Sequence, residues 1–476
     1  MGGKWVQRWN PSPEGQAGSF LPCLRIQGQR SIEGMDWRLP FSKSHAIRYL
    51  VLAALSRQTV TFQNMSGAGE DTISMRRCLM QCGVVFEDLD EEGRPLATEV
   101  NGDLRPHPHA TAWIVHGVGP DGLNAPGTVL HAGNSGTALR ILIGLASRWS
   151  TPVMLDGDAS LRKRPFHIMI EAMKSGGVSV SNGTGPEELP LLVCGPMSFS
   201  QPIVLDATIS SQPMTSWLIA SAGNEASIQL VRSGEPVSQR HSALTMDLCK
   251  SLGASILQDG DACVIEPWEP VFPNTVVQMP TDASMMAFPL LAAVVCNTKI
   301  DVVNAPDEED SLGHELLVQH AAALGLNHVR SSWVASREPG EPVTLNLRDG
   351  NDLITPVSAM LALGHGGTVT GAAHAAHKES NRLSKTLELL QAFGLDGQVT
   401  TEGLVLQGGQ SLCPPTDVVR TWGDHRLQMT AIVLAMGVEG EVLIEGDTLH
   451  CVADTEAADR WANQGVSLKR HLHQHW

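Results

Sequence analysis

Apolar residues recur at helical spacing along most of this chain, in segments that each end in a glycine followed by an apolar residue. Glycine readily adopts the left-handed conformation that closes a helix. Six such endings occur, and the last five are spaced by about seventy residues. They are Gly83, Gly177, Gly253, Gly325, Gly394 and Gly465. The repetition predicts six similar structural units.

Each ending follows an amphipathic helix, as over residues 72–81, 242–252 and 382–393. A more apolar helix comes earlier in each unit and begins after a polar or glycine-containing turn. These earlier helices start near Lys43, Asn134, Ser211, Asp282, Asp352 and Asp424. Short alternating runs, such as residues 58–62 and 440–445, predict strands. The unit therefore holds two helices and roughly four strands, a βαβαββ-type repeat.

Two features of the repeat narrow the fold class to an α/β protein with two lobes of three units each. No Gly-x-Gly-x-x-Gly follows a predicted strand, which argues against a Rossmann sheet. The repeat is also longer than those of the common solenoids. The glycine- and histidine-rich segment 100–126 lengthens the first interval, and we expect it to be a loop.

Composition excludes several classes of partner. The 476 residues carry a formal charge of −17, which argues against nucleic acid or an anionic membrane as a partner. The nine cysteines are scattered without a Cys-x-x-Cys pair, and Cys78 and Cys82 are expected to be core residues, so a reducing cytoplasm fits best. Residues 1–10 lack the apolar core of a signal peptide, and the longest apolar runs, such as 290–296, are too short to span a bilayer.

The strongest candidate for chemistry is the turn Ser42-Lys43-Ser44, which opens into an apolar helix. Either serine could cap the helix, and the free backbone N–H groups would face an anion beside the Lys43 ammonium. Arg48 lies one turn further on, on the same side as Ser44. Three such residues alone are more often only a polar helix cap. Recurrence of the arrangement favours an anion site.

Similar polar groups stand at the heads of the other predicted helices. Gly136 and Thr137 follow Asn134 in a glycine-flanked turn that leaves backbone free to approach a ligand. Although the chain is acidic overall, cationic residues lie at the starts of several predicted helices. Two carboxylates among them could act as general acid and base. The cations are Lys43, Arg164, Lys378, Arg382 and Arg426; the carboxylates are Asp352 and Glu379; further polar groups are Ser210, Ser211, Gln212 and Ser238.

Six motifs in order resemble those of the 5-enolpyruvylshikimate-3-phosphate synthase family, from about Leu39 to the C-terminal end. They are Leu-Pro-Phe-Ser-Lys-Ser, Gly-Asn-Ser-Gly-Thr-Ala-Leu-Arg, Arg-Lys-Arg-Pro, Ser-Ser-Gln, Lys-Glu-Ser-Asn-Arg-Leu and Gly-Asp-His-Arg. The resemblance implies a two-lobed enolpyruvyl transferase fold, an inside-out barrel of three units per lobe. Residues 41–279 would form one lobe, and residues 1–40 with 280–476 the other. The active site would lie between the lobes, and the N-terminal strand would belong to the C-terminal lobe.

The resemblance also implies a reaction. The 5-hydroxyl of shikimate 3-phosphate would add to C2 of phosphoenolpyruvate, and the tetrahedral intermediate would then lose phosphate. No metal or organic cofactor would take part, and the enzyme would be a monomer. Asp352 would act on the 5-hydroxyl and Glu379 on the methylene carbon, with Lys43 as a further proton partner.

Binding roles follow from the matching positions. Lys43, Arg164, Arg382 and Arg426 would hold phosphoenolpyruvate, in a pocket shaped by Asn134, Gly136 and Thr137. Shikimate 3-phosphate would be held by Ser44, Arg48, Ser210, Ser211, Gln212, Ser238, Asp352 and Lys378.

The chain departs from the family pattern at four positions. Phe41 replaces a small residue and is expected to crowd the anion site, Asn381 replaces an aspartate that could orient Arg382, and His241 stands where an aromatic residue often packs. Asp454 stands where some members carry a lysine. Two alternatives remain open: a non-catalytic homologue that kept the fold, and a sister enzyme acting on UDP-N-acetylglucosamine. The sister enzyme should carry a cysteine within residues 158–165, and none occurs there.

Overall fold

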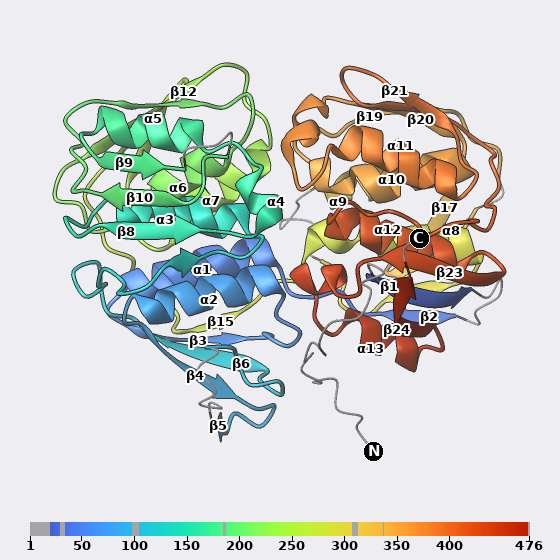
Figure 1. Ribbon diagram of the computed structural model, residues 1–476, viewed down its shortest axis with the longest axis horizontal. Helices are drawn as coiled ribbons and strands as arrows, with labels where there is room; N and C mark the ends of the chain where they lie inside the picture. The colour runs from blue at the N-terminus through green and yellow to red at the C-terminus, as the bar shows by residue number, and fades with distance from the viewer. Residues whose placement is uncertain are drawn as a thin grey trace.

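The computed structural model describes residues 20–28, 34–97, 104–183, 187–306, 313–336 and 338–474. The molecule consists of two lobes that lie side by side (Figure 1). Residues 1–10, which lack a signal-peptide pattern, are outside the described ranges. No helix within those ranges is long and apolar enough to cross a membrane.

Six small sheets in the described ranges follow one pairing scheme, which confirms the predicted repeat. In five of them a parallel edge pair is followed by two antiparallel pairs, and the first sheet adds a third antiparallel pair at its far edge. In the sixth, Val419 forms the parallel bridge to β23. The sheets, in strand order, are β15(Val276–Gln278)-β3(Thr59–Gln63)-β6(Ala112–His116)-β4(Val85–Leu89)-β5(Pro95–Leu96); β7(Leu130–His131)-β8(Val153–Asp156)-β10(Leu191–Cys194)-β9(Ser179–Asn182); β11(Ile203–Asp206)-β12(Ile228–Ser233)-β14(Ala262–Ile265)-β13(Ile256–Asp259); β2(Met35–Trp37)-β16(Ile300–Val302)-β18(Ser332–Ala335)-β17(Leu326–Val329); β19(Val343–Asn346)-β20(Gly366–Thr370)-β22(Leu404–Gln407)-β21(Gly397–Val399); and β23(Gly440–Glu445)-β1(Phe20–Gly28)-β24(Ser467–Gln474).

Each unit places its more apolar helix inside the lobe. The inner helices are almost wholly buried, and they pack on one another, as α3 does on α6 and α10 and α12 do on α8. The inner helices are α1(Lys43–Leu55), α3(Gly136–Ala146), α6(Gln212–Ala220), α8(Ala287–Cys296), α10(Ile354–Leu363) and α12(His425–Met436). The other helices are α2(Glu70–Gln81), α4(Ala159–Arg162), α5(His167–Ser175), α7(Gln239–Ser251), α9(His314–Gln319), α11(Arg382–Ala392) and α13(Ala457–Asn463). Short 3₁₀ turns are η1(Ala283–Met285), η3(Asn351–Leu353), η4(Ala373–His377) and η5(Leu449–Val452).

All six predicted closing glycines have positive φ, from 74° at Gly325 to 107° at Gly253. A side chain would strain the backbone there, so glycine at these positions ends the unit's second helical segment at low cost. Gly325 differs from the other five, because it does not directly follow a helix: α9 ends at Gln319, and turns connect it to Gly325.

Two hydrophobic cores lie in the two lobes. One gathers buried side chains from Phe41 to Met279, and the other gathers residues 24–39 together with residues 285–466. The N-terminal strands β1 and β2 pair with β23, β24 and β16, so they lie among C-terminal elements (Figure 1). The prediction for the N-terminal strand is therefore confirmed.

The chain crosses between the lobes twice, and the two crossings are hydrogen-bonded to each other. Phe41 bridges Thr281, and the Ser42 N–H donates to the Pro280 carbonyl at 2.7 Å. Since both crossings pass side by side, the joint between the lobes is short and narrow.

The prediction of a loop over residues 100–126 is wrong for its centre. Residues 112–116 form β6, which lies between β3 and β4 in the first sheet. Trp113 and Val115 are fully buried in the first core. A five-residue strand flanked by long turns gives a weak pattern, and its pairing partners lie far away in the sequence. Residues 100–103 are outside the described ranges.

Candidate functional site

A cavity of about 80 Å³ lies between the lobes, and the N-terminal ends of several helices reach it. Its lining includes residues at the heads of α1, α2, α3, α6, α11 and α12. Each helix N-terminus presents unpaired N–H groups and a partial positive charge. Five cationic side chains and three carboxylates also line it, so its local charge is opposite in sign to that of the whole chain.

Lys43 stands at the first residue of α1, where the Ser42 hydroxyl caps the helix by accepting from the His45 N–H. Its ammonium donates to Asp71 at 3.1 Å and lies 3.5 Å from Nε2 of His425. Burial raises the pKa of Asp71, although the Lys43 charge opposes the rise. Burial and the same ammonium hold the pKa of His425 well below its ordinary value, so the ring is neutral at pH 7. Lys43 therefore joins residues of both lobes.

Arg164 faces the cavity from the turn after α4. Its guanidinium donates to the Asn134 side-chain oxygen at 2.6 Å and lies 3.6 Å from Glu379 across the cleft. A Cβ at Gly136 would lie 2.9 Å from Arg140 and 3.1 Å from Arg164, within the space those guanidiniums occupy. Glycine at this helix start therefore leaves room for two cations.

Arg382, at the start of α11, is the centre of the carboxylate network. Its side chain is 2% exposed and donates to Asp352 at 2.7 Å, to Glu379 at 2.6 Å and to Asp424 at 2.9 Å. Three carboxylates around one guanidinium fix its orientation, because each oxygen satisfies a different donor of the planar fork. Arg382 in turn positions Asp352 and Glu379 beside the cavity.

The two candidate acid–base groups are both held ionised. Burial by itself would raise the pKa of Glu379, but the charges of Arg382 and Arg164 outweigh it and bring the pKa well below its ordinary value. Burial likewise acts on Asp352 against the charges of Arg426 and Arg382, and the pKa of Asp352 is also well below its ordinary value. Both groups are therefore ionised and can accept a proton.

Two cations of the cavity, Arg48 and Lys378, form no ion pair with a carboxylate in the described ranges. Arg48 is 1% exposed and donates to Thr245, Thr215 and backbone carbonyls, and burial lowers its pKa to about 10. Within the described ranges Lys378 forms no ion pair, and burial lowers its pKa although Asp352 opposes the change. Lys378 is therefore available to an anion, whereas each guanidinium nitrogen of Arg48 already donates to a protein oxygen and Arg48 contributes its charge to the cavity lining.

Ser238 occupies a strained position at the start of α7. Its φ of 52° is unusual for a residue with a side chain, and its backbone N–H donates to the Arg348 carbonyl of the other lobe at 3.1 Å. The Asn351 amide donates to its hydroxyl at 2.7 Å. The strain is thus held by contacts across the cleft, at the edge of the cavity.

Fifteen of the sixteen site residues predicted from the sequence line this one cavity. They are Lys43, Ser44, Arg48, Asn134, Gly136, Thr137, Arg164, Ser210, Ser211, Gln212, Ser238, Asp352, Lys378, Glu379 and Arg382. Arg426 is the exception. It is 1% exposed and lies behind Asp352, donating to the carbonyl and the hydroxyl of Ser284, each at 2.8 Å.

The sequence did not predict roles for four residues of the site. Asp71 and His425 line the cavity, and Asp424 and Arg140 contact lining residues from behind. His425 and Asp424 stand in the Gly-Asp-His-Arg motif, and Arg140 ends another quoted motif, so their positions were marked but their roles were not. Asp71 follows Glu70 in the first turn of α2, where acidic residues are common for local reasons. Only its contact with Lys43 distinguishes it.

Three departures from the family pattern lie outside the cavity lining. Phe41 packs in the first core and faces a different cavity, so the expected crowding of the anion site is wrong. Asn381 is exposed and caps α11, while Asp424 orients Arg382 from behind. Asp454 is buried and pairs with Arg460. His241, by contrast, does line the cavity, and burial lowers its pKa to about 3.

The lobes meet closely on both sides of the cavity. On one side Ala68 bridges Asp454, and a Cβ at Gly69 would lie 2.4 Å from the Val452 carbonyl oxygen. On the other side the Gln239 N–H donates to Asp349 at 2.7 Å. The structure is therefore a closed arrangement of the lobes.

Solved structures share this architecture. An EPSP synthase from Acinetobacter baumannii superposes with a TM-score of 0.72 at 20% identity, covering 94% of this chain and 100% of that chain. The enolpyruvyl transferase NikO from Streptomyces tendae superposes with a TM-score of 0.63 at 15% identity, covering 95% and 100%. The chain thus has the same two-lobed fold as these two solved structures.

Sequence comparison gives the family of the chain. The 3-phosphoshikimate 1-carboxyvinyltransferase of Synechococcus sp. (strain RCC307) is 30% identical over 445 residues, covering 88% of this chain and 94% of the relative. The enzyme of the same name from Methanothermobacter thermautotrophicus is 27% identical over 421 residues, covering 87% and 92%. The family model for EPSP synthase (3-phosphoshikimate 1-carboxyvinyltransferase) matches residues 26–455. The chain belongs to the EPSP synthase family.

Proposed function

We propose that this chain transfers the enolpyruvyl group of phosphoenolpyruvate to the 5-hydroxyl of shikimate 3-phosphate and releases phosphate. One observation carries the proposal: helix heads from both lobes bring fifteen predicted site residues to a single cavity. The reaction brings together two phosphates and two carboxylates. Five cations and several helix N-termini at one place offset that charge inside an acidic molecule.

Two of the three carboxylates among these cations, Asp352 and Glu379, supply the proton transfers that charge neutralisation alone does not. In the addition step, Asp352 accepts the proton of the 5-hydroxyl as its oxygen bonds to C2 of phosphoenolpyruvate, and Glu379 gives a proton to C3. In the elimination step, Glu379 takes a proton back from the new methyl group while the C2–phosphate bond breaks. Lys43 stabilises the departing phosphate and can protonate it.

Substrate binding must raise the pKa of Glu379 for the first step to occur. The charges of Arg382 and Arg164 hold this carboxyl ionised. Anionic substrate groups bound to the same guanidiniums would offset their charge and restore proton affinity to Glu379. Glu379 can therefore act as an acid only when phosphoenolpyruvate is bound.

The proposed binding roles divide the lining residues between the two substrates. Phosphoenolpyruvate would be held by Lys43, Arg164 and Arg382, beside the turn of Asn134, Gly136 and Thr137. Shikimate 3-phosphate would be held by Ser44, Arg48, Ser210, Ser211, Gln212, Ser238 and Lys378. We assign Arg426 a different role from the one expected, because its donors are engaged with Ser284 and Asp352. It positions Asp352 and keeps it ionised.

The lobes must separate to admit the substrates. The closed cavity of about 80 Å³ is smaller than the roughly 300–1,000 Å³ typical of sites for small ligands. We propose that residues 41–279 move as one lobe against residues 1–40 with 280–476, about the two paired crossings. The division of the two cores at the same positions supports this boundary.

Purified protein mixed with both substrates should release inorganic phosphate, and neither substrate alone should do so. Loss of turnover with intact binding of shikimate 3-phosphate would favour a non-catalytic homologue. We also propose that the enzyme works as a monomer in the cytoplasm with no cofactor. Sedimentation of the active protein and its activity after exhaustive dialysis against a chelator test these last points.

A further inference from the structure

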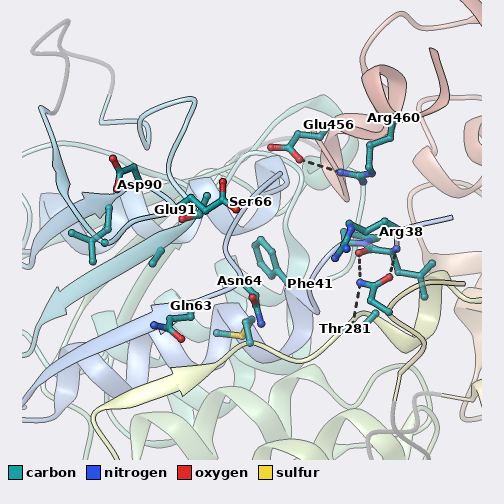
Figure 2. Close-up of a pocket in the computed structure, with 18 of the residues that line it drawn as sticks. Arg38, Phe41, Gln63, Asn64, Ser66, Asp90, Glu91, Thr281, Glu456 and Arg460 are labelled. Carbon is teal, nitrogen blue, oxygen red and sulfur yellow. Dashed lines mark hydrogen bonds and ion pairs between the residues drawn. The ribbon is translucent and has the colours of Figure 1, made fainter. Parts of the chain in front are cut away.

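A second and larger cavity, of about 830 Å³, lies against the two chain crossings (Figure 2). It shares no lining residue with the active-site cavity. Its floor contains residues 39–41 from one crossing and Met279 and Thr281 from the other. Its walls come from different lobes, with residues 89–93 and 63–66 on one and Arg38, Glu456 and Arg460 on the other. We call it the hinge cavity.

The two walls of the hinge cavity differ in charge. The turn between β4 and β5 supplies three successive carboxylates, Asp90, Glu91 and Glu92, while Arg38 lies on the opposite side (Figure 2). Asp90 and Glu92 are already paired with Arg94. Arg460 is paired with Glu456 and Asp454.

Each wall carries one charged side chain that has no ion-pair partner. In the part of the chain that the structure describes, neither Arg38 nor Glu91 forms an ion pair, and both are exposed. A purely anionic ligand near Arg38 would face the acidic turn, and a purely cationic ligand would face Arg38. A molecule with both charges, oriented across the cavity, satisfies each wall.

An apolar surface lies between these charges. The Phe41 ring lies in the middle of the view, between Glu91 and Arg38 (Figure 2). Leu39, Leu89 and Met279 add to this surface. The cavity volume is within the range of small-molecule sites, which combine an apolar lining with a few well-placed polar groups.

We propose that the hinge cavity binds a small zwitterion of the amino-acid class. Its carboxylate pairs with the Arg38 guanidinium, its ammonium pairs with the Glu91 carboxylate, and its carbon chain packs on Phe41. Phe41, a departure from the family pattern that the active site leaves unused, thereby gains a role as the apolar contact.

The position of the cavity couples it to the movement of the lobes. Phe41 bridges Thr281 at the joint, and the next residues, Ser42 and Lys43, start α1 and enter the active site. A ligand that spans both walls fixes the separation of the lobes at this point. Because it binds one lobe arrangement better than another, it shifts the opening equilibrium.

The test measures binding directly and does not depend on turnover. Isothermal titration calorimetry of the full-length protein with ω-amino acids from 4-aminobutanoate to 8-aminooctanoate should give an affinity that peaks at one chain length. Hexanoate and hexylamine, which carry one charge each, should bind at least about tenfold more weakly than the matching zwitterion, as expected for a lost charge pair. Phosphate release should change when the best zwitterion is added.

Variants locate the site. Arg38→Ala and Glu91→Gln should each weaken binding by about tenfold or more, whereas the exposed controls Lys174→Ala and Glu388→Gln should leave it unchanged. Absence of binding by every member of the series overturns the proposal. The proposal is also overturned if hexanoate binds as tightly as the zwitterion, or if neither Arg38→Ala nor Glu91→Gln weakens binding. A preparation without turnover should give the same binding curve, so failure of the proposed reaction is distinguishable from failure of this site.

Discussion

Glu379→Gln is the substitution that most directly tests the proposed chemistry. Glutamine keeps the size of the side chain and can still accept a hydrogen bond from Arg382, which donates to Glu379 at 2.6 Å. It cannot exchange a proton at working pH. Arg382 retains Asp352 and Asp424 as partners, so its orientation and the fold around it survive the change.

The expected loss follows from the role of the group in both steps. A positioned general acid or base contributes typically about 10²–10⁴ in rate, and Glu379 acts once as acid and once as base. We therefore expect kcat to fall by at least about 10³, which corresponds to roughly 4 kcal/mol of transition-state stabilisation. Binding of shikimate 3-phosphate should change by only a few fold, because Glu379 is not among the proposed contacts of this substrate.

Phosphate release at saturating substrates measures kcat, and calorimetry with shikimate 3-phosphate measures binding. Glu388→Gln is the matched control, since Glu388 is exposed on the nearby helix α11 and, in the described ranges, pairs only with the half-buried Lys385. It should retain the wild-type rate. A rate for Glu379→Gln within a few fold of the wild type would remove this residue from the proton transfers and refute the reasoning.

Three further outcomes are expected. Lys43→Met should remove on the order of 2–4 kcal/mol of transition-state stabilisation, as for one lost preorganised donor, and kcat/KM should fall accordingly. An unchanged kcat/KM in steady-state assays would contradict this. Gly69→Ala should keep the lobes apart, since its Cβ would lie 2.4 Å from a backbone oxygen of the other lobe. In solution scattering with both substrates, the Gly69→Ala protein should compact less than the wild type or the control Gly127→Ala, whose Cβ has no atom within 4 Å. Equal compaction would show that the contact at Gly69 does not limit lobe closure. Asp88→Asn breaks a fully buried pair with Arg76, 2.5 Å apart, and should lower the free energy of unfolding in urea by about 3–5 kcal/mol, whereas a loss under about 1 kcal/mol would show that the pair is dispensable.

Local chemistry made the repeat visible in the sequence. Helix starts depend on capping side chains a few residues away, as with Ser135, whose hydroxyl accepts from the Ala138 N–H, and Asp424, whose carboxylate accepts from the Arg426 N–H. Helix ends depend on glycines whose positive φ other residues adopt only at a cost. Such interactions involve near neighbours in the chain, so a single sequence is enough to predict them.

Side chains whose partners are distant in the sequence were harder to place. The strand β6 was missed because its stability comes from pairing with β3 and β4, which the pattern of residues 100–126 does not reveal. Arg426 was expected at the ligand, yet its donors engage Ser284, which lies 142 residues earlier. A motif residue can either bind the ligand or position another site residue, depending on which side chains the fold places beside it.

By itself, the sequence determined the six-fold repeat, the helix heads that carry the polar groups, and the family to which the motifs point. Only the tertiary structure decided that Lys43 contacts His425, which lies 382 residues later, and that Phe41 lines the hinge cavity instead of the active site. It also decided that each wall of the hinge cavity carries a charged side chain without an ion-pair partner. The physical reason is range: backbone capping acts within one helical turn, whereas burial and charge pairing depend on which surfaces the folded lobes bring together.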